Sequence, residues 1–177
     1  MQLGGGGRRK TKYTYAYDNA VTDRQMTMVN KCLTHPRGWA SKGYRFVQVH
    51  LRDTPDITIH FKNGSEMARM FRRPDLRNLS VTATLGHASD VYFHLGNWNS
   101  PPAAFQARSH RKNRYRMYLV NHEIGHCLGF GHVTADEVAR QAAKQRRLTN
   151  TQVVSCPIML QQSVHTLPLC QSNPFVT

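Results

Sequence analysis

One segment of the sequence holds most of the residue types that could do chemistry. It reads His122-Glu123-Ile124-Gly125-His126-Cys127-Leu128-Gly129-Phe130-Gly131-His132. Residues four apart lie on one face of a helix, so His122 and His126 are expected to converge on one point. Gly129 can adopt a positive φ and end the helix, which lets the chain turn back and bring His132 to the same point.

Three neutral imidazoles predict a catalytic zinc site rather than a structural one. Structural zinc sites use four protein ligands and favour cysteine, whereas three histidines leave a fourth position for water. Zinc in such a site lowers the pKa of water towards about 7 and polarises a carbonyl. Glu123 lies about 100° round the helix from His122, and therefore beside the metal. We expect one zinc ion on His122, His126 and His132, with Glu123 as the general base.

The full spacing makes this prediction specific. A His-Glu-x-x-His core alone also describes a pair of histidines on a helix surface. With the glycine and the third histidine at their offsets, a random match is on the order of one in ten thousand or rarer. The other seven histidines show no ligand spacing and are expected on the surface or hydrogen-bonded in the core.

The pattern of apolar residues predicts which elements position this segment. Strands are expected at 13–17, 44–51, 57–61 and 91–95, helices at 22–33, 109–128 and 135–148, a loop with at most one helical turn at 66–80, and irregular structure over the last 25 residues. Strands that precede helices predict an α+β domain. The length of 177 residues suits one domain, 13–177, after a flexible Gly/Arg-rich basic tail at 1–12.

Charge is the strongest feature of the composition. Twenty-four Lys and Arg residues stand against ten acidic ones, a net charge of +14. Such a surface attracts nucleic acid or an anionic protein surface. The charge is equally consistent with a solvated basic surface that has no particular partner. No apolar stretch could span a membrane, and no apolar segment follows the basic N-terminus as in a signal peptide. As the sequence stands, this favours an intracellular or virion-associated protein over one secreted by the Sec pathway.

The eleven-residue pattern resembles the metzincin clan of zinc endopeptidases, which also have a downstream methionine turn. Here Met159, at the end of Cys156-Pro157-Ile158-Met159, lies 27 residues after His132. The resemblance implies that Met159 forms an apolar floor under the metal and is not a ligand.

Further segments are similar to a small actinobacterial metzincin-like family of unknown function. They are His35-Pro36-Arg37-Gly38-Trp39, Arg45-Phe46-Val47, Tyr118-Leu119-Val120-Asn121, Pro157-Ile158-Met159 with Gln161-Gln162, and Cys170-Gln171-Ser172-Asn173-Pro174-Phe175. The resemblance implies a minimal zincin with a twisted mixed sheet, a packed helix, the zinc helix and a short C-terminal subdomain. It also implies that Val91-Tyr92-Phe93-His94-Leu95 is the sheet edge above the cleft, where a peptide adds by β-pairing.

Three details of the resemblance concern the C-terminal part of the chain. A disulfide between Cys156 and Cys170 resembles a family trait, with free buried thiols as the alternative. Residues 133–155, with a basic helix, form a longer link than the family's. Gln161 stands where some metzincins place a tyrosine as a movable fifth ligand.

Three functions are consistent with these residues. The first is a zinc-dependent endopeptidase in which Glu123 moves the proton. The second is a structural or assembly protein, for instance a virion or nucleic-acid-associated component, that keeps the zincin fold with or without the metal. The third is a zinc amidase acting on a cell-wall peptide. Glu123 favours an enzyme, because a purely structural site needs no general base.

Overall fold

The computed structural model describes residues 10–102, 105, 111–134, 136–140, 143–144, 154–162 and 170–176. Its elements are β1 (Lys12–Tyr17), α1 (Asp23–Leu33), η1 (Trp39–Lys42), β2 (Arg45–Gln48), η2 (Leu51–Asp53), β3 (Ile57–Lys62), α2 (Gly64–Met70), η3 (Pro74–Asn78), β4 (Val81–Leu85), β5 (Ala88–His94), α3 (Leu95–Asn99), α4 (Arg111–Cys127), β6 (Val154–Ser155) and β7 (Cys170–Gln171). The expected α+β class with a mixed sheet is confirmed.

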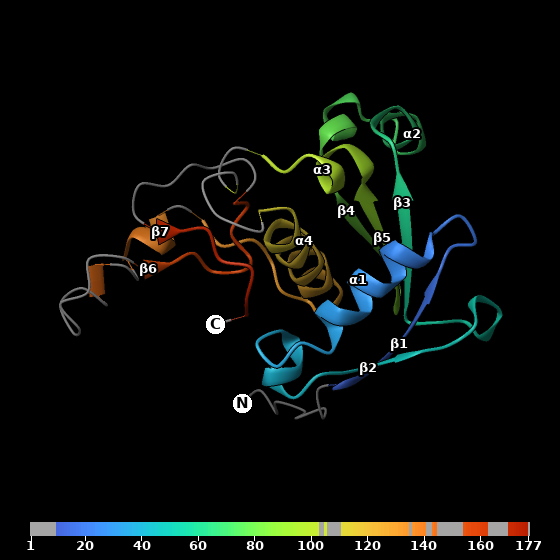
Figure 1. The fold of residues 1–177 in the computed structure, drawn as a ribbon, viewed down its shortest axis with the longest axis horizontal. Helices are drawn as coiled ribbons and strands as arrows, with labels where there is room; N and C mark the ends of the chain where they lie inside the picture. The colour runs from blue at the N-terminus through green and yellow to red at the C-terminus, as the bar shows by residue number, and fades with distance from the viewer. Residues whose placement is uncertain are drawn as a thin grey trace, which may run out of the picture.

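A five-stranded sheet forms one layer of the fold. Its strand order is β2-β1-β3-β5-β4, and every neighbouring pair is parallel except β5 with β4. Alternate residues of β3, namely Ile57, Ile59 and Phe61, are buried. The helices α1 and α4 lie on one side of this sheet (Figure 1). Tyr15 of β1 donates to Asn30 of α1 over 2.8 Å, which places α1 on this buried face.

The opposite face of the sheet is only partly buried and carries polar side chains. His60 of β3 lies between two carboxylates, with its ring nitrogens 2.8 Å from Asp18 and 2.8 Å from Asp90. Its ring also stacks on Tyr92 at 4.5 Å. His60 is therefore a hydrogen-bonded histidine away from the three zinc-site candidates, as expected for the residues without ligand spacing.

The prediction that Val91-Tyr92-Phe93-His94-Leu95 forms the sheet edge is wrong. Residues 91–94 belong to β5, which lies inside the sheet between β3 and β4, and Leu95 begins α3. The edge strand on this side of the sheet is β4. It pairs antiparallel with β5 through a hairpin whose turn contains Gly86 at φ +61°. Strand order depends on pairing between distant segments. Here β5 is not an edge strand, because β4, the short strand before it in sequence, pairs with its outer side.

Local signals predict the helix α1 correctly and miss α2. Thr22 caps α1 in a capping box with Gln25, as Ser/Thr-x-x-Gln at a helix start favours. The Asn63-Gly64 pair, a turn signal, instead begins α2, because the Asn63 side chain accepts from the backbone N–H groups of Ser65 and Glu66. The helix α2 and the 3₁₀ helix η3 thus occupy much of the range 66–80, where the sequence predicted a loop with at most one helical turn.

The helix α4 runs through the middle of the fold. Every residue from Tyr115 to Gly125 is buried, so this part of the helix is enclosed on all sides. Residues 109 and 110, where the predicted helix begins, lie outside the described residues, as does the tail up to residue 9. Of the predicted basic helix at 135–148, the described residues 136–140 and 143–144 are helical. No helix among the described residues is long and apolar enough to cross a membrane.

Candidate metal centre

The end of α4 positions two of the three histidines and redirects the chain toward the third. Gly129 has φ +87°, and the N–H groups of Gly129 and Phe130 donate to the carbonyls of His126 and Gly125, both over 2.9 Å. This is a Schellman ending, with the glycine in the left-handed conformation that its lack of a Cβ permits. The chain reverses there, and His132 comes back over the last turn of α4.

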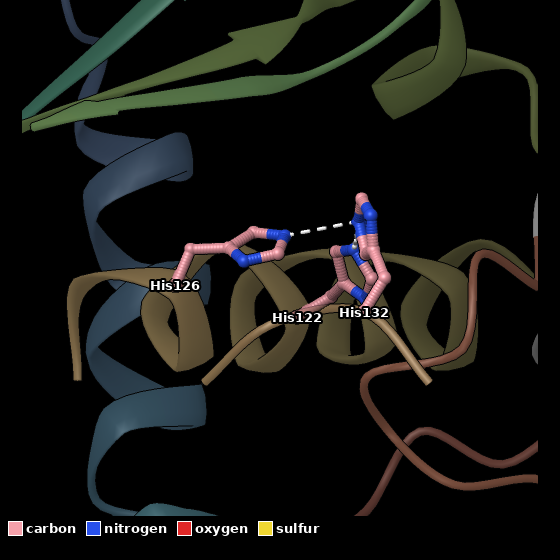
Figure 2. A group of neighbouring side chains, drawn as sticks. All are labelled: His122, His126 and His132. Atoms are coloured by element: carbon pink, nitrogen blue, oxygen red, sulfur yellow. Dashed lines mark hydrogen bonds between the residues drawn. The ribbon is translucent and has the colours of Figure 1, made fainter. Parts of the chain in front are cut away.

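The three imidazoles meet at one point. Figure 2 shows their rings pointing toward one another, two from α4 and the third from the segment after it. His132 Nε2 lies 3.2 Å from His122 Nε2 and 3.1 Å from His126 Nε2. Three nitrogens bound tetrahedrally to zinc at ~2.0–2.1 Å would be about 3.3 Å apart. The spacing therefore suits a single zinc-sized cation.

Backbone carbonyls fix which ring nitrogen faces the centre. His122 Nδ1 lies 2.9 Å from the carbonyl of Ile158, and His126 Nδ1 lies 2.9 Å from the carbonyl of Phe130. A carbonyl only accepts, so each Nδ1 carries the proton and each neutral ring presents the lone pair of Nε2. Burial lowers the pKa of His122 to about 3, which keeps this ring neutral. The three Nε2 lone pairs face one another and would repel if no cation lay between them. This set of donor atoms therefore fits a cation.

Met159 packs against Gly125 of α4. A Cβ at Gly125, between the two histidines in sequence, would overlap the Met159 sulfur and lie 2.8 Å from Cζ2 of Trp39. Trp39 in turn donates its indole N–H to the carbonyl of Asn121 over 2.7 Å and stacks on Phe130 at 4.8 Å. The surroundings of Gly125 are therefore apolar and closely packed, and a side chain at position 125 would displace Met159 and Trp39.

Gly125→Ala is expected to destabilise the protein. The methyl group would overpack the contact with Met159 and Trp39, which costs about 1–3 kcal/mol of unfolding free energy and exceeds the ~1 kcal/mol that alanine contributes to a helix. Urea unfolding measures the difference. Gly131→Ala is the matched control, since a Cβ there meets no atom within 4 Å. Equal stability of the two variants would contradict this account of the packing.

A disulfide and the hydrogen bonds of a side-chain amide hold the segment that contains Ile158 and Met159. Cys156 and Cys170 form a disulfide with an S–S distance of 2.09 Å, which settles the two states that the sequence left open. The Gln162 side chain donates to the carbonyl of Pro157 over 3.0 Å, and its Oε1 accepts from the N–H of Asn173 over 2.8 Å. These links join residues 156–162 to residues 170–173.

The same segment is tied to α4. Tyr118 donates its hydroxyl proton to the carbonyl of Leu160 over 2.9 Å and accepts from the N–H of Gln162 over 2.9 Å. Asn121 donates to the carbonyl of Pro174 over 2.8 Å. The position of the Ile158 carbonyl against His122 is thus set by a chain of buried contacts between distant parts of the sequence.

Glu123 lies beside the histidines and not among their meeting nitrogens. Only 5% of its surface is exposed, and its Oε2 accepts from the hydroxyl of Thr82 over 2.7 Å. Burial raises the pKa of Glu123 to about 7, against the lowering effect of the Thr82 hydrogen bond. A carboxyl group with this pKa can both take up and release a proton near neutral pH.

A cleft of about 330 Å³ opens over these groups. Its lining residues are Leu76, Leu79, Ser80, Val81, Thr82, Thr84, His122, Glu123, His126, His132 and Gln161. All four predicted metal and base residues line it, and Gln161 does so as well. Glu123 is the only acidic residue among the described residues that line it. None of the five residues from Val91 to Leu95 lines the cleft; η3 and the edge strand β4 form that wall instead.

Thr82 contacts Glu123 but belongs to none of the sequence motifs described above. The alternation Val81-Thr82-Ala83-Thr84-Leu85, followed by Gly86, is the available signal, since it is typical of a strand that enters a hairpin. It could have predicted β4. It could not have placed Thr82 beside Glu123, 41 residues away in sequence.

The comparison with known proteins gives a family and no activity. Residues 6–169 match the family described as "Protein of unknown function (DUF3152)". No curated protein matches the chain.

Proposed function

The chain belongs to this family of unknown function, so its activity has to be inferred from its own residues, and we propose that it is a zinc-dependent endopeptidase of metzincin type. The observation that carries the proposal is the convergence of three Nε2 atoms next to a buried carboxylate in an open cleft. In this proposal the fold is a minimal zincin, α4 is the zinc helix, and Met159 is the methionine of the Met-turn.

Each group at the centre has a distinct role in the proposal. His122, His126 and His132 would hold one zinc ion, which supplies Lewis-acid polarisation of a carbonyl and acidifies a water molecule. Glu123 would accept a proton from the attacking water and pass it to the leaving amine nitrogen.

The wall opposite the histidines would bind the substrate backbone. Among the described strands, β4 pairs only with β5, so its other edge is available for an added strand. An extended peptide could pair there and present its scissile carbonyl to the metal. The apolar side chains of Leu76, Leu79 and Val81 would contact the substrate side chains.

An assembly protein remains the second candidate, because of the net charge of +14. Such a charge favours binding to nucleic acid or to an acidic protein surface, and this binding weakens as salt increases. An open three-histidine site with a buried carboxylate is nevertheless unlike a structural zinc site, which closes around its metal with four protein ligands. This chemistry favours the endopeptidase.

Metal removal tests the proposal. The purified protein is expected to contain one zinc ion per chain and to cleave members of a mixed-sequence peptide library, as measured by elemental analysis and mass spectrometry. Dialysis against a chelator should abolish cleavage, and added zinc should restore it. Bound zinc without cleavage of any peptide, together with salt-sensitive binding to nucleic acid, would contradict the endopeptidase and support the assembly protein.

A further inference from the structure

The hydroxyl of Thr82 joins the edge strand β4 to the base of the proposed reaction. Thr82 Oγ1 lies 2.7 Å from Oε2 of Glu123 and 3.1 Å from the backbone carbonyl of the same residue. Register pairs Thr82 with Val91, a fully buried residue of β5, so its side chain points to the helix side of the sheet. The contact therefore crosses from the sheet layer to α4.

Glu123 depends on this contact for its orientation. Within the described part of the chain, the Thr82 hydroxyl is the one hydrogen-bond donor that contacts its carboxylate. A buried carboxylate without a donor loses the hydration that it has in water, and no other hydrogen bond among the described residues then fixes its orientation. With Oε2 occupied by Thr82, Oε1 is the oxygen left to contact water in the cleft.

We infer that Thr82 is a positioning residue that holds the Glu123 carboxylate in line for proton transfer. The inference rests on the proposed function, because it assigns Thr82 a part in that reaction. Thr82 also belongs to the strand on which a peptide would pair, so a substrate seated along β4 contacts the same strand that orients the base. Threonine serves here through its hydroxyl, which reaches Glu123 from a β-branched side chain suited to a strand.

Three variants separate the hydroxyl from the shape of the side chain. Thr82→Val removes the hydroxyl and keeps the volume, whereas Thr82→Ser keeps the hydroxyl. Thr58→Val makes the same change on the opposite face of the sheet, away from the cleft. Thr82→Val is expected to lower kcat about 10- to 100-fold with little change in KM, while Thr82→Ser retains most of the rate. Thr58→Val should match the unchanged protein.

Zinc affinity and hydroxamate binding provide readouts that do not require peptide cleavage. All three variants should bind zinc within about twofold of the unchanged protein, because Glu123 is not a ligand. Acetohydroxamic acid chelates zinc and releases its hydroxyl proton to a neighbouring carboxylate, so its affinity reports the position of that base. Isothermal titration with zinc-loaded protein should show binding about 10-fold weaker for Thr82→Val, and restored by Thr82→Ser.

The outcomes distinguish this inference from the proposed function. Weaker hydroxamate binding by Thr82→Val in a protein that cleaves no peptide would support the positioning role and reject the endopeptidase. Equal hydroxamate binding and equal kcat for Thr82→Val and the unchanged protein would overturn the positioning role. A loss shared equally by Thr82→Ser and Thr82→Val would overturn it too, because the hydroxyl would then be irrelevant.

Discussion

Replacement of Glu123 by glutamine is expected to reduce kcat/KM for peptide cleavage by about 10²- to 10⁴-fold, the usual contribution of a general acid–base group. Glutamine keeps the size of the side chain and can still accept from Thr82, but it cannot take a proton from water. The protein should retain one zinc ion, because the metal is held by the three histidines. Steady-state kinetics and elemental analysis on the same preparation check both parts.

Glu66→Gln is the matched control for this substitution. Glu66 lies in the capping box of α2, where an amide oxygen can replace the carboxylate oxygen that accepts from Asn63. Activity should not change in this variant. Unchanged cleavage by Glu123→Gln would instead show that another group moves the proton. Loss of zinc together with activity would show that Glu123 contributes to metal binding.

Loss of the Cys156–Cys170 disulfide is expected to reduce the free energy of unfolding by about 3 kcal/mol, as the chain-entropy argument gives for a loop of this size. The two cysteines are 14 residues apart, and the loop between them contains Ile158 and Met159. The Ile158 carbonyl orients His122 at 2.9 Å, so a looser loop should also weaken zinc binding. Groups that orient metal ligands typically contribute 10–100-fold to affinity, and we expect about 10-fold here.

Urea unfolding and a zinc competition titration measure the two effects in a Cys156→Ala/Cys170→Ala variant. A reducing agent should lower the free energy of unfolding and the zinc affinity of the unchanged protein by similar amounts. It should have no further effect on the double variant. Cys127→Ala is a second control, since Cys127 is a free cysteine. Zinc affinity that is equal with and without the disulfide would mean that the hydrogen bonds of Gln162 and Tyr118 hold the Ile158 carbonyl by themselves.

The sequence alone predicts most of the metal centre, because its geometry is local. His122 and His126 are one helical turn apart, and the left-handed Gly129 returns the chain to His132 within three residues. The convergence of these rings requires only helix periodicity and one turn. The cap of α1 at Thr22 could be predicted for the same reason, since Gln25 lies three residues away.

Tertiary structure alone determines which residues outside the segment 122–132 contact the histidines and Glu123. Strand order placed β4 at the edge and β5 inside, whereas the family resemblance implied that 91–95 is the edge, because a strand's neighbours are chosen by packing over the whole sheet. The same pairing brings Thr82 to Glu123 across 41 residues, and the buried C-terminal contacts bring Ile158 to His122 across 36. The sequence therefore determined the convergence of the three histidines and the place of Glu123 beside them, because one helix and the turn that ends it suffice. Only the fold determined which groups orient them, because those contacts join segments that no local rule relates.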